Sequence, residues 1–115
     1  MGAKKTLPTY KIFNAQAVSS TTSYNSLTTN ITNLDNISLQ IDWTGTNAGS
    51  FDVLVSNDDQ TFHSLNVPNL PAASGSSGGF IINLNQVGQP YIKLSYTNAS
   101  GSGVLTASIF GKDLN

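Results

Sequence analysis

Apolar and polar side chains alternate along several short stretches of the chain. From Ile37 to Trp43, every odd-numbered residue is apolar and every even-numbered residue is polar. Successive side chains of a β-strand point to opposite faces, so this period of two predicts a strand with one buried face, which includes Trp43. Similar patterns predict strands at residues 10–15, 51–55, 80–84, 92–96 and 105–109, with a shorter candidate at 61–65.

Segments of turn-forming residues separate these strands. Residues 56–60, 68–79, 88–90 and 98–103 are rich in Gly, Pro, Asn, Asp and Ser. A Gly-containing turn at residues 44–49 predicts that the strands on either side of it form a hairpin or a neighbouring pair. Seven or eight short strands at this spacing predict an all-β fold, a single antiparallel β-sandwich of jelly-roll or immunoglobulin-like type.

Residues 17–33 fit this pattern less well. Ser and Thr dominate the segment, and its possible anchors are Val18, Tyr24, Leu27 and Ile31. We therefore expect either edge strands or an extended arm. A domain of this size buries only about two thirds of the surface of its unfolded chain, so a contact with another subunit would supply burial that a lone chain lacks. This segment thus favours a homo-oligomer.

Neutral polar residues largely replace charged ones. The 115 residues, enough for one domain, include fifteen Ser, twelve Thr and thirteen Asn, and the net charge is −1. Glu, Arg and Cys are absent, and His63 is the single histidine. Disulfides, cysteine nucleophiles, thiolate zinc sites and multi-histidine metal sites are therefore excluded within one chain. We predict no catalytic residues, no cofactor and no enzyme activity.

Charge and hydropathy also bear on partners and location. A nearly neutral chain offers no basic field for a polyanion, so we expect no nucleic-acid binding. No apolar run approaches the length of a membrane span, and no signal-like apolar region follows Lys4 and Lys5. We therefore expect that the chain does not insert into a membrane. We also expect that it is synthesised in a cytoplasm. An uncharged surface rich in hydroxyl and amide groups suits either contact with neighbouring subunits or binding of a neutral glycan.

A cluster of oxygen-bearing side chains follows the strand predicted at residues 51–55. Asn57, Asp58 and Asp59 offer the oxygen ligands that Ca²⁺ prefers, but calcium loops space their ligands at alternate positions and add a later bidentate acid, which this chain lacks. We expect a turn held by Asx hydrogen bonds, and no metal site. His63 and Ser64 are adjacent on a strand and so point to opposite faces, which argues against a catalytic pair.

The tyrosines are expected to be partly exposed, because a phenol hydroxyl tolerates a wet edge. They are Tyr10, Tyr24, Tyr91 and Tyr96. Tyr91 and Lys93 alternate with apolar neighbours, so their side chains face outward, toward solvent or toward another subunit.

Three segments carry a resemblance to known families. Residues 51–62, with the sequence FDVLVSNDDQTF, resemble the strand-turn-strand of discoidin-like and related galactose-binding-like jelly rolls, although Asp59 stands where Gly is usual and Phe62 where Trp is usual. Residues 90–96, PYIKLSY, look like a later strand of those domains. Together with residues 100–112, SGSGVLTASIFGK, the pattern also resembles small β-sandwich proteins of phage structural genes. The resemblance covers residues 37–112 and implies a jelly-roll type of sandwich.

The departures from these families favour one branch of the resemblance. Extracellular discoidin-like domains commonly join their termini with a disulfide and carry Arg at their loop tips, whereas this chain has neither Cys nor Arg. A relative assembled in a host cytoplasm, such as a phage virion protein, fits better than a secreted lectin.

Two functional hypotheses follow. The leading one is a non-enzymatic phage virion protein, a capsid decoration, cement or fibre-associated protein located in the virion, whose partners are the major capsid protein or fibre and vertex subunits. The alternative is a glycan-binding module used in adhesion to host surface glycans. We divide the chain into an extended N-terminal arm at residues 1–8 and a sandwich domain at 9–115. The candidate interface or glycan-binding residues are Lys4, Lys5, Asn57, Asp58, Asp59, Tyr91 and Lys93.

Overall fold

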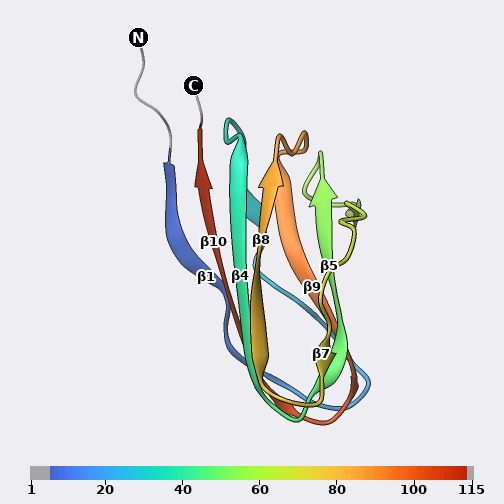
Figure 1. The fold of residues 1–115 in the computed structure, drawn as a ribbon. Helices are drawn as coiled ribbons and strands as arrows, with labels where there is room; N and C mark the ends of the chain where they lie inside the picture. Colours follow the sequence, from blue (N-terminus) through green and yellow to red (C-terminus); the bar gives the residue numbers. More distant parts are fainter. Residues whose placement is uncertain (1–5, 114–115) are drawn as a thin grey trace.

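The computed structural model describes residues 6–113, which fold as an all-β sandwich of two antiparallel sheets (Figure 1). Ten strands occur in this range, against the seven or eight predicted, because four pairings of two or three residues add to the six long strands. The strands are β1 (Thr6–Val18), β2 (Ser23–Asn25), β3 (Thr29–Asn30), β4 (Asn36–Gly45), β5 (Ala48–Ser56), β6 (His63–Ser64), β7 (Ala73–Ser74), β8 (Gly78–Asn85), β9 (Tyr91–Ser100) and β10 (Gly103–Lys112). Within the same residues, no helix is long and apolar enough to cross a membrane.

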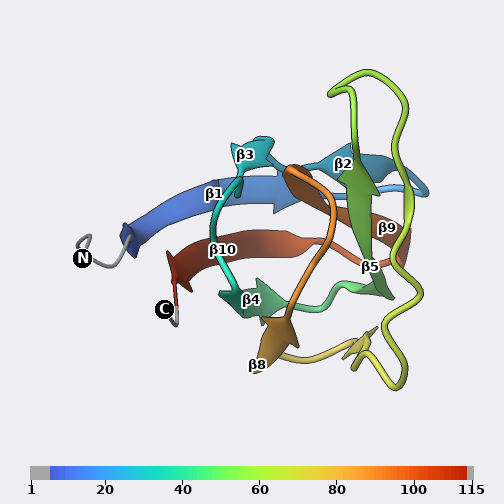
Figure 2. The ribbon, with the colours of Figure 1, turned by 90° about the horizontal axis from the view of Figure 1, so that it is seen from above.

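The two sheets have different strand orders. One sheet has four strands in the order β1-β10-β4-β8, and the other has the order β2-β9-β5-β6, with β3 also on β9 and β7 also on β5. Seen from above, β8 is at the end of the four-stranded sheet, next to β4 (Figure 2). All pairings are antiparallel, as the sequence predicted.

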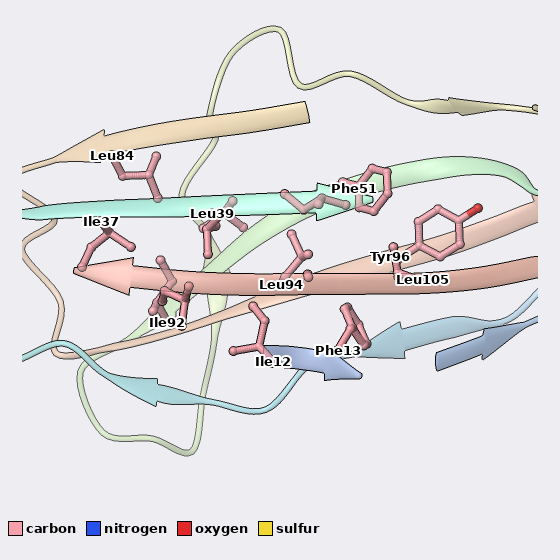
Figure 3. Packing of buried hydrophobic residues seen from close by; sticks show 14 of the residues in the cluster. Ile12, Phe13, Ile37, Leu39, Phe51, Leu84, Ile92, Leu94, Tyr96 and Leu105 are labelled. Atoms are coloured by element: carbon pink, nitrogen blue, oxygen red, sulfur yellow. The ribbon is translucent and has the colours of Figure 1, made fainter. Parts of the chain in front are cut away.

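The strand β4 shows why the alternating pattern gives this fold. Its odd-numbered side chains from Ile37 to Trp43 are all buried, and its even-numbered side chains lie on the outer face. Branched apolar side chains from β9 and β10 meet them between the sheets (Figure 3). Fully burying one such side chain contributes about 1.5–3 kcal/mol, so this layer dominates the stability of the sandwich.

Four aromatic rings close one end of the core. Phe51 contacts the rings of Trp43, Phe80 and Tyr96, with centroid distances of 5.4, 5.4 and 4.8 Å. Trp43 is 6 % exposed, as predicted, and its indole N–H donates a 2.9 Å hydrogen bond to the carbonyl of Ser76. The cluster therefore joins both sheets and the segment that leads into β8.

The prediction that β4 and β5 form a hairpin or a neighbouring pair is wrong, because these two strands belong to different sheets. The link between them crosses from one sheet to the other. The backbone N–H of Thr46 donates to the carbonyl of Ser102, and the buried amide of Asn47 donates a 3.1 Å hydrogen bond to the hydroxyl of Tyr96. These bonds hold the crossing in place without a ladder between β4 and β5.

Residues 17–33 form edge strands, the first of the two alternatives. β1 extends to Val18, and β2 and β3 both pair with β9. Val18 and Ile31 are buried, as befits anchors, whereas Leu27 is 62 % exposed. Tyr24 lies opposite Tyr96 in the ladder, so a segment of low hydrophobicity is kept in place by backbone pairing with a buried strand.

The long strand β1 has an irregular register against β10. Shifts occur between Lys11 and Phe13 and again before Gln16, where Ala15 has a φ of 51°. A bulge of this kind breaks the alternation of faces, and as a result the adjacent residues Ile12 and Phe13 are both buried.

The start of β1 and the end of β10 lie side by side (Figure 1). Thr6 is the register partner of Lys112, and Leu7 that of Gly111. Residues 6–8 of the predicted arm therefore lie in β1, and residues 1–5 lie outside the described part of the chain.

Candidate interaction surfaces

The turn that follows β5 is organised around one carboxylate. Oδ1 of Asp58 accepts hydrogen bonds of 2.9 Å from the backbone N–H groups of Gln60 and Thr61 and one of 2.8 Å from the hydroxyl of Ser56. These bonds, that from Thr61 first, lower the pKa of Asp58 from 3.8 to about 2. The predicted Asx turn is confirmed, and Asp59 takes the left-handed backbone with φ 59°. Within residues 6–113, no group of three or more His, Asp or Glu is placed to hold a metal.

This turn lies at the same end of the molecule as Tyr91. Ser56, the last residue of β5, is the register partner of Tyr91 at the start of β9. A hollow of about 290 Å³ opens beside the turn, and its lining residues are Val55, Ser56, Asn57, Asp58, Thr61, His63 and Gln89. Two of the sequence-predicted residues, Asn57 and Asp58, thus share one surface feature.

Lys93 lies on the outer face of the six-stranded sheet. Its ammonium is 4.1 Å from the centroid of the Phe62 ring, which is partly buried. The contact is a cation–π interaction and holds the lysine over the segment that follows the turn. Tyr91 faces the same side of β9, two residues earlier. Lys4 and Lys5, the remaining candidates, lie outside the described residues.

The prediction of partial exposure holds for three of the four tyrosines. Tyr10, Tyr24 and Tyr91 are partly exposed, whereas Tyr96 is fully buried. The Tyr96 hydroxyl donates to Asn98 and accepts from Asn47, so buried amides replace the water that the prediction assumed.

A hollow on the outer face of the four-stranded sheet was not found from the sequence. It has a volume of about 490 Å³, and its lining residues are Asn36, Ile37, Ser38, Asn83, Asn85, Phe110 and Lys112. In the part of the chain that the structure describes, no protein group forms a hydrogen bond with the side chains of Asn36, Ser38, Asn83 or Asn85. The alternating pattern of the strands indicates that these polar side chains point outward. Their position around one hollow follows from the strand order, in which β4 lies between β8 and β10.

A second hollow, of about 670 Å³, lies beside the C-terminal half of β8. Its apolar lining comes mainly from Leu65, Val67, Ile82, Leu84 and Val87. Oε1 of Gln89, which also lines this hollow, is buried and has no hydrogen-bond partner among the described residues. The hollow therefore combines apolar surface with the unused hydrogen-bonding groups of Asn83, Asn85 and Gln89.

These surfaces suit binding by contact. The hollows are shallow openings lined by amide, hydroxyl, apolar and a few charged groups from the strands and from the loops beside them. Amides and hydroxyls both donate and accept hydrogen bonds, so they can match another protein's backbone or the hydroxyl groups of a sugar.

The fold resembles solved structures of viral and prophage origin. A structure of the infectious bursal disease virus Gx strain matches with a TM-score of 0.63 and 14% identity, over 96% of this chain and 32% of that chain. The VP2 subviral particle of infectious bursal disease virus matches with a TM-score of 0.60 and 14% identity, with the same coverage. This chain thus spans about a third of the length of those viral chains.

A prophage-derived protein has the same extent as this chain. The SPBc2 prophage-derived protein YomS matches with a TM-score of 0.60 and 8% identity, over 96% of both chains. At such low identities the three matches show the fold alone. No protein-family model and no curated protein matches the sequence. None of the three structures is described as a discoidin-like domain, so the predicted likeness to that family is not confirmed.

Proposed function

We propose that the protein is a non-enzymatic structural component of a phage particle, which docks onto neighbouring virion subunits as a capsid decoration or fibre-associated protein. The observation that carries this proposal is the match of 96% of the chain to chains from a virus and its subviral particle, together with the end-to-end match to a prophage-derived protein. The shared fold makes a shared kind of role the simplest interpretation.

The surface supports docking for a physical reason. Only 10% of the residues are charged, so a broad contact removes few ions from water. Hydroxyl and amide side chains can exchange their hydrogen bonds with water for bonds with a neighbouring subunit at low cost. Repeated contacts of this kind, arranged by the symmetry of a particle, would hold many copies in equivalent positions.

The test uses particles of the phage that encodes the chain, compared with particles from a deletion of its gene. We expect the chain to co-purify with intact particles and its density to be missing from images of the deletion particles. Many copies in symmetric positions would indicate decoration, and a few copies at a vertex or tail would indicate a fibre-associated role. If purified wild-type particles also lack the chain, the proposal is contradicted.

The outer-face hollow favours a second candidate, a neutral-glycan site used in adhesion. Phe110 offers an aromatic ring beside the amides of Asn36, Asn83 and Asn85, whose hydrogen-bonding groups are unused within residues 6–113. A ring that packs on the apolar face of a sugar, with amides reaching its hydroxyls, is a chemically sound combination.

A neutral-glycan array tests this candidate. We expect a hit for the wild-type chain that is lost in Phe110→Ala and kept in Phe62→Leu, since Phe62 lies outside this hollow and contacts Lys93 of the other sheet. The absence of any hit, or a hit that survives Phe110→Ala, would contradict the glycan site.

A further inference from the structure

The strand β8 is an edge strand of the four-stranded sheet. It pairs with β4 on one side, and within the described residues no backbone hydrogen bond joins its other side to any segment (Figure 2). In an antiparallel ladder, alternate residues direct their N–H and C=O groups away from the paired strand. β8 therefore presents a row of donors and acceptors along an eight-residue strand.

β8 lacks the features that usually protect such an edge. Proteins protect exposed edges with Lys, Pro, bulges or very short strands. The sequence GGFIINLN contains neither a charge nor Pro, and its register against β4 is continuous from Gly78 to Asn85. Ile81 on its outer face is 60 % exposed. An edge of this kind is suited to pairing with another strand.

The inner face of β8 is also incompletely covered. On β4, the inward side chains from Ile37 to Trp43 are buried. On β8, the inward side chains of Phe80 and Ile82 remain partly exposed, because the sheet ends there. A further strand beside β8 would cover both and would extend the layer of apolar side chains by one position.

The charge pattern favours a second copy of this chain as the strand that pairs with β8. Residues 60–92, which contain β8 and both segments that line the adjoining hollow, include no Asp, Glu, Lys or Arg. Two identical charged edges would repel each other, whereas two copies of this edge do not. A two-fold axis would place apolar inward residues beside apolar inward residues, and it would use the same patch on both copies.

We propose that β8 pairs in antiparallel fashion with β8 of a second copy of this chain, which joins the two four-stranded sheets into one continuous sheet. This interface deepens the docking role proposed above, since the paired chain would be the unit that docks. None of the interface residues predicted from the sequence lies on β8.

The first test compares three exposed apolar residues. Leu27, Ile81 and Val104 are 62, 60 and 40 % exposed, and only Ile81 lies on β8. In sedimentation experiments at up to about 100 µM, we expect the wild-type chain to have twice its monomer mass. Ile81→Lys should give a monomer, because a two-fold axis brings the two introduced charges close together, and Leu27→Lys and Val104→Lys should remain dimers.

The second test uses the absence of cysteine from the sequence. Single substitutions Ile81→Cys and Asn83→Cys place one thiol on the outer face of β8, and Val104→Cys places one elsewhere on the same sheet. Under mild oxidation we expect disulfide-linked dimers from at least one β8 variant and none from Val104→Cys. The more efficient of the two β8 variants reports the register of the pair.

Each outcome decides the proposal. A wild-type chain that stays monomeric at the highest concentration overturns it, as does a dimer that survives Ile81→Lys or dissociates in Leu27→Lys. Circular dichroism and melting curves of each variant separate loss of pairing from loss of folding. The virion role fails separately, since absence of the chain from particles leaves the dimer measurement in solution unaffected.

Discussion

The hydroxyl of Tyr96 donates a 2.8 Å hydrogen bond to Oδ1 of Asn98, two residues farther along β9, and both side chains are fully buried. The same hydroxyl accepts a bond from Asn47, and the amide of Asn98 donates to the carbonyls of Ser20 and Gly101. A single tyrosine and two asparagines thus tie together the loops at one end of the sandwich, in a place from which water is excluded.

Removal of the Tyr96 hydroxyl should destabilise the fold. Tyr96→Phe leaves the Asn98 oxygen and the Asn47 amide without their partner, and an unsatisfied buried polar group costs about 1–3 kcal/mol. We expect a loss of this size in the free energy of unfolding, measured with denaturant. Tyr24→Phe is the control, because the Tyr24 hydroxyl bonds to exposed backbone at Ser19, and it should cost less. Equal losses in both variants would contradict the buried network.

Gly101 should not tolerate a side chain. Its φ is 73°, and a Cβ there would overlap the carbonyl oxygen of Thr46. Strain of this kind costs about 1–3 kcal/mol. We expect Gly101→Ala to lower the melting temperature by several degrees. The matched control is Gly88→Ala, where a Cβ meets nothing within 4 Å, and its melting temperature should stay close to that of the wild type.

Phe51 should be among the most sensitive core positions. It contacts three other rings from both sheets, and its truncation to Ala should cost about 3–5 kcal/mol. The fluorescence of Trp43, the single tryptophan, reports the unfolding transition. Leu27→Ala removes an exposed side chain and should leave the denaturant midpoint nearly unchanged. A Phe51→Ala variant as stable as Leu27→Ala would show that the ring cluster contributes little.

The Asp58 turn should make stability depend on pH in acid. Because the pKa of Asp58 in the folded state is about 2, below the ordinary value of 3.8, the carboxylate stabilises the fold above about pH 4, and this contribution is lost as the pH falls toward 2. The difference in melting temperature between the wild type and Asp58→Asn should be largest near neutral pH and should shrink in that acid window. A difference that stays constant from pH 7 to about pH 2 would argue against this role of Asp58.

Strands were predictable from the sequence because side-chain periodicity is local. The pattern of residues 37–43 reports which face is buried, and the structure buries that face. The partner of a strand is not local information. β4 and β5 both direct apolar residues into the core from opposite sheets, so their patterns are equally compatible with a hairpin and with a sandwich crossing.

The errors and omissions have physical causes of the same kind. Tyr96 shares the buried face of β9 with Ile92 and Leu94, but its hydroxyl led to the prediction of a partly exposed side chain. In the structure, two buried amides form hydrogen bonds with that hydroxyl. Asn83 of β8 and Phe110 of β10 are far apart in the sequence. They line the same hollow because both strands pair with β4, one on each side. Pairing across long distances in the chain determines such surfaces, and no short pattern encodes it.

The pairing of Thr6 with Lys112 places the first and the last strand of the sandwich side by side at one end. Because chain entry and exit are adjacent, the domain can be inserted into a loop of a host protein, or its ends can be joined and the chain reopened at the exposed Gly88, with little disturbance of the remaining strands. Peptides fused before β1 and after β10 would emerge from one pole, leaving the opposite pole, with its buried tyrosine network, undisturbed.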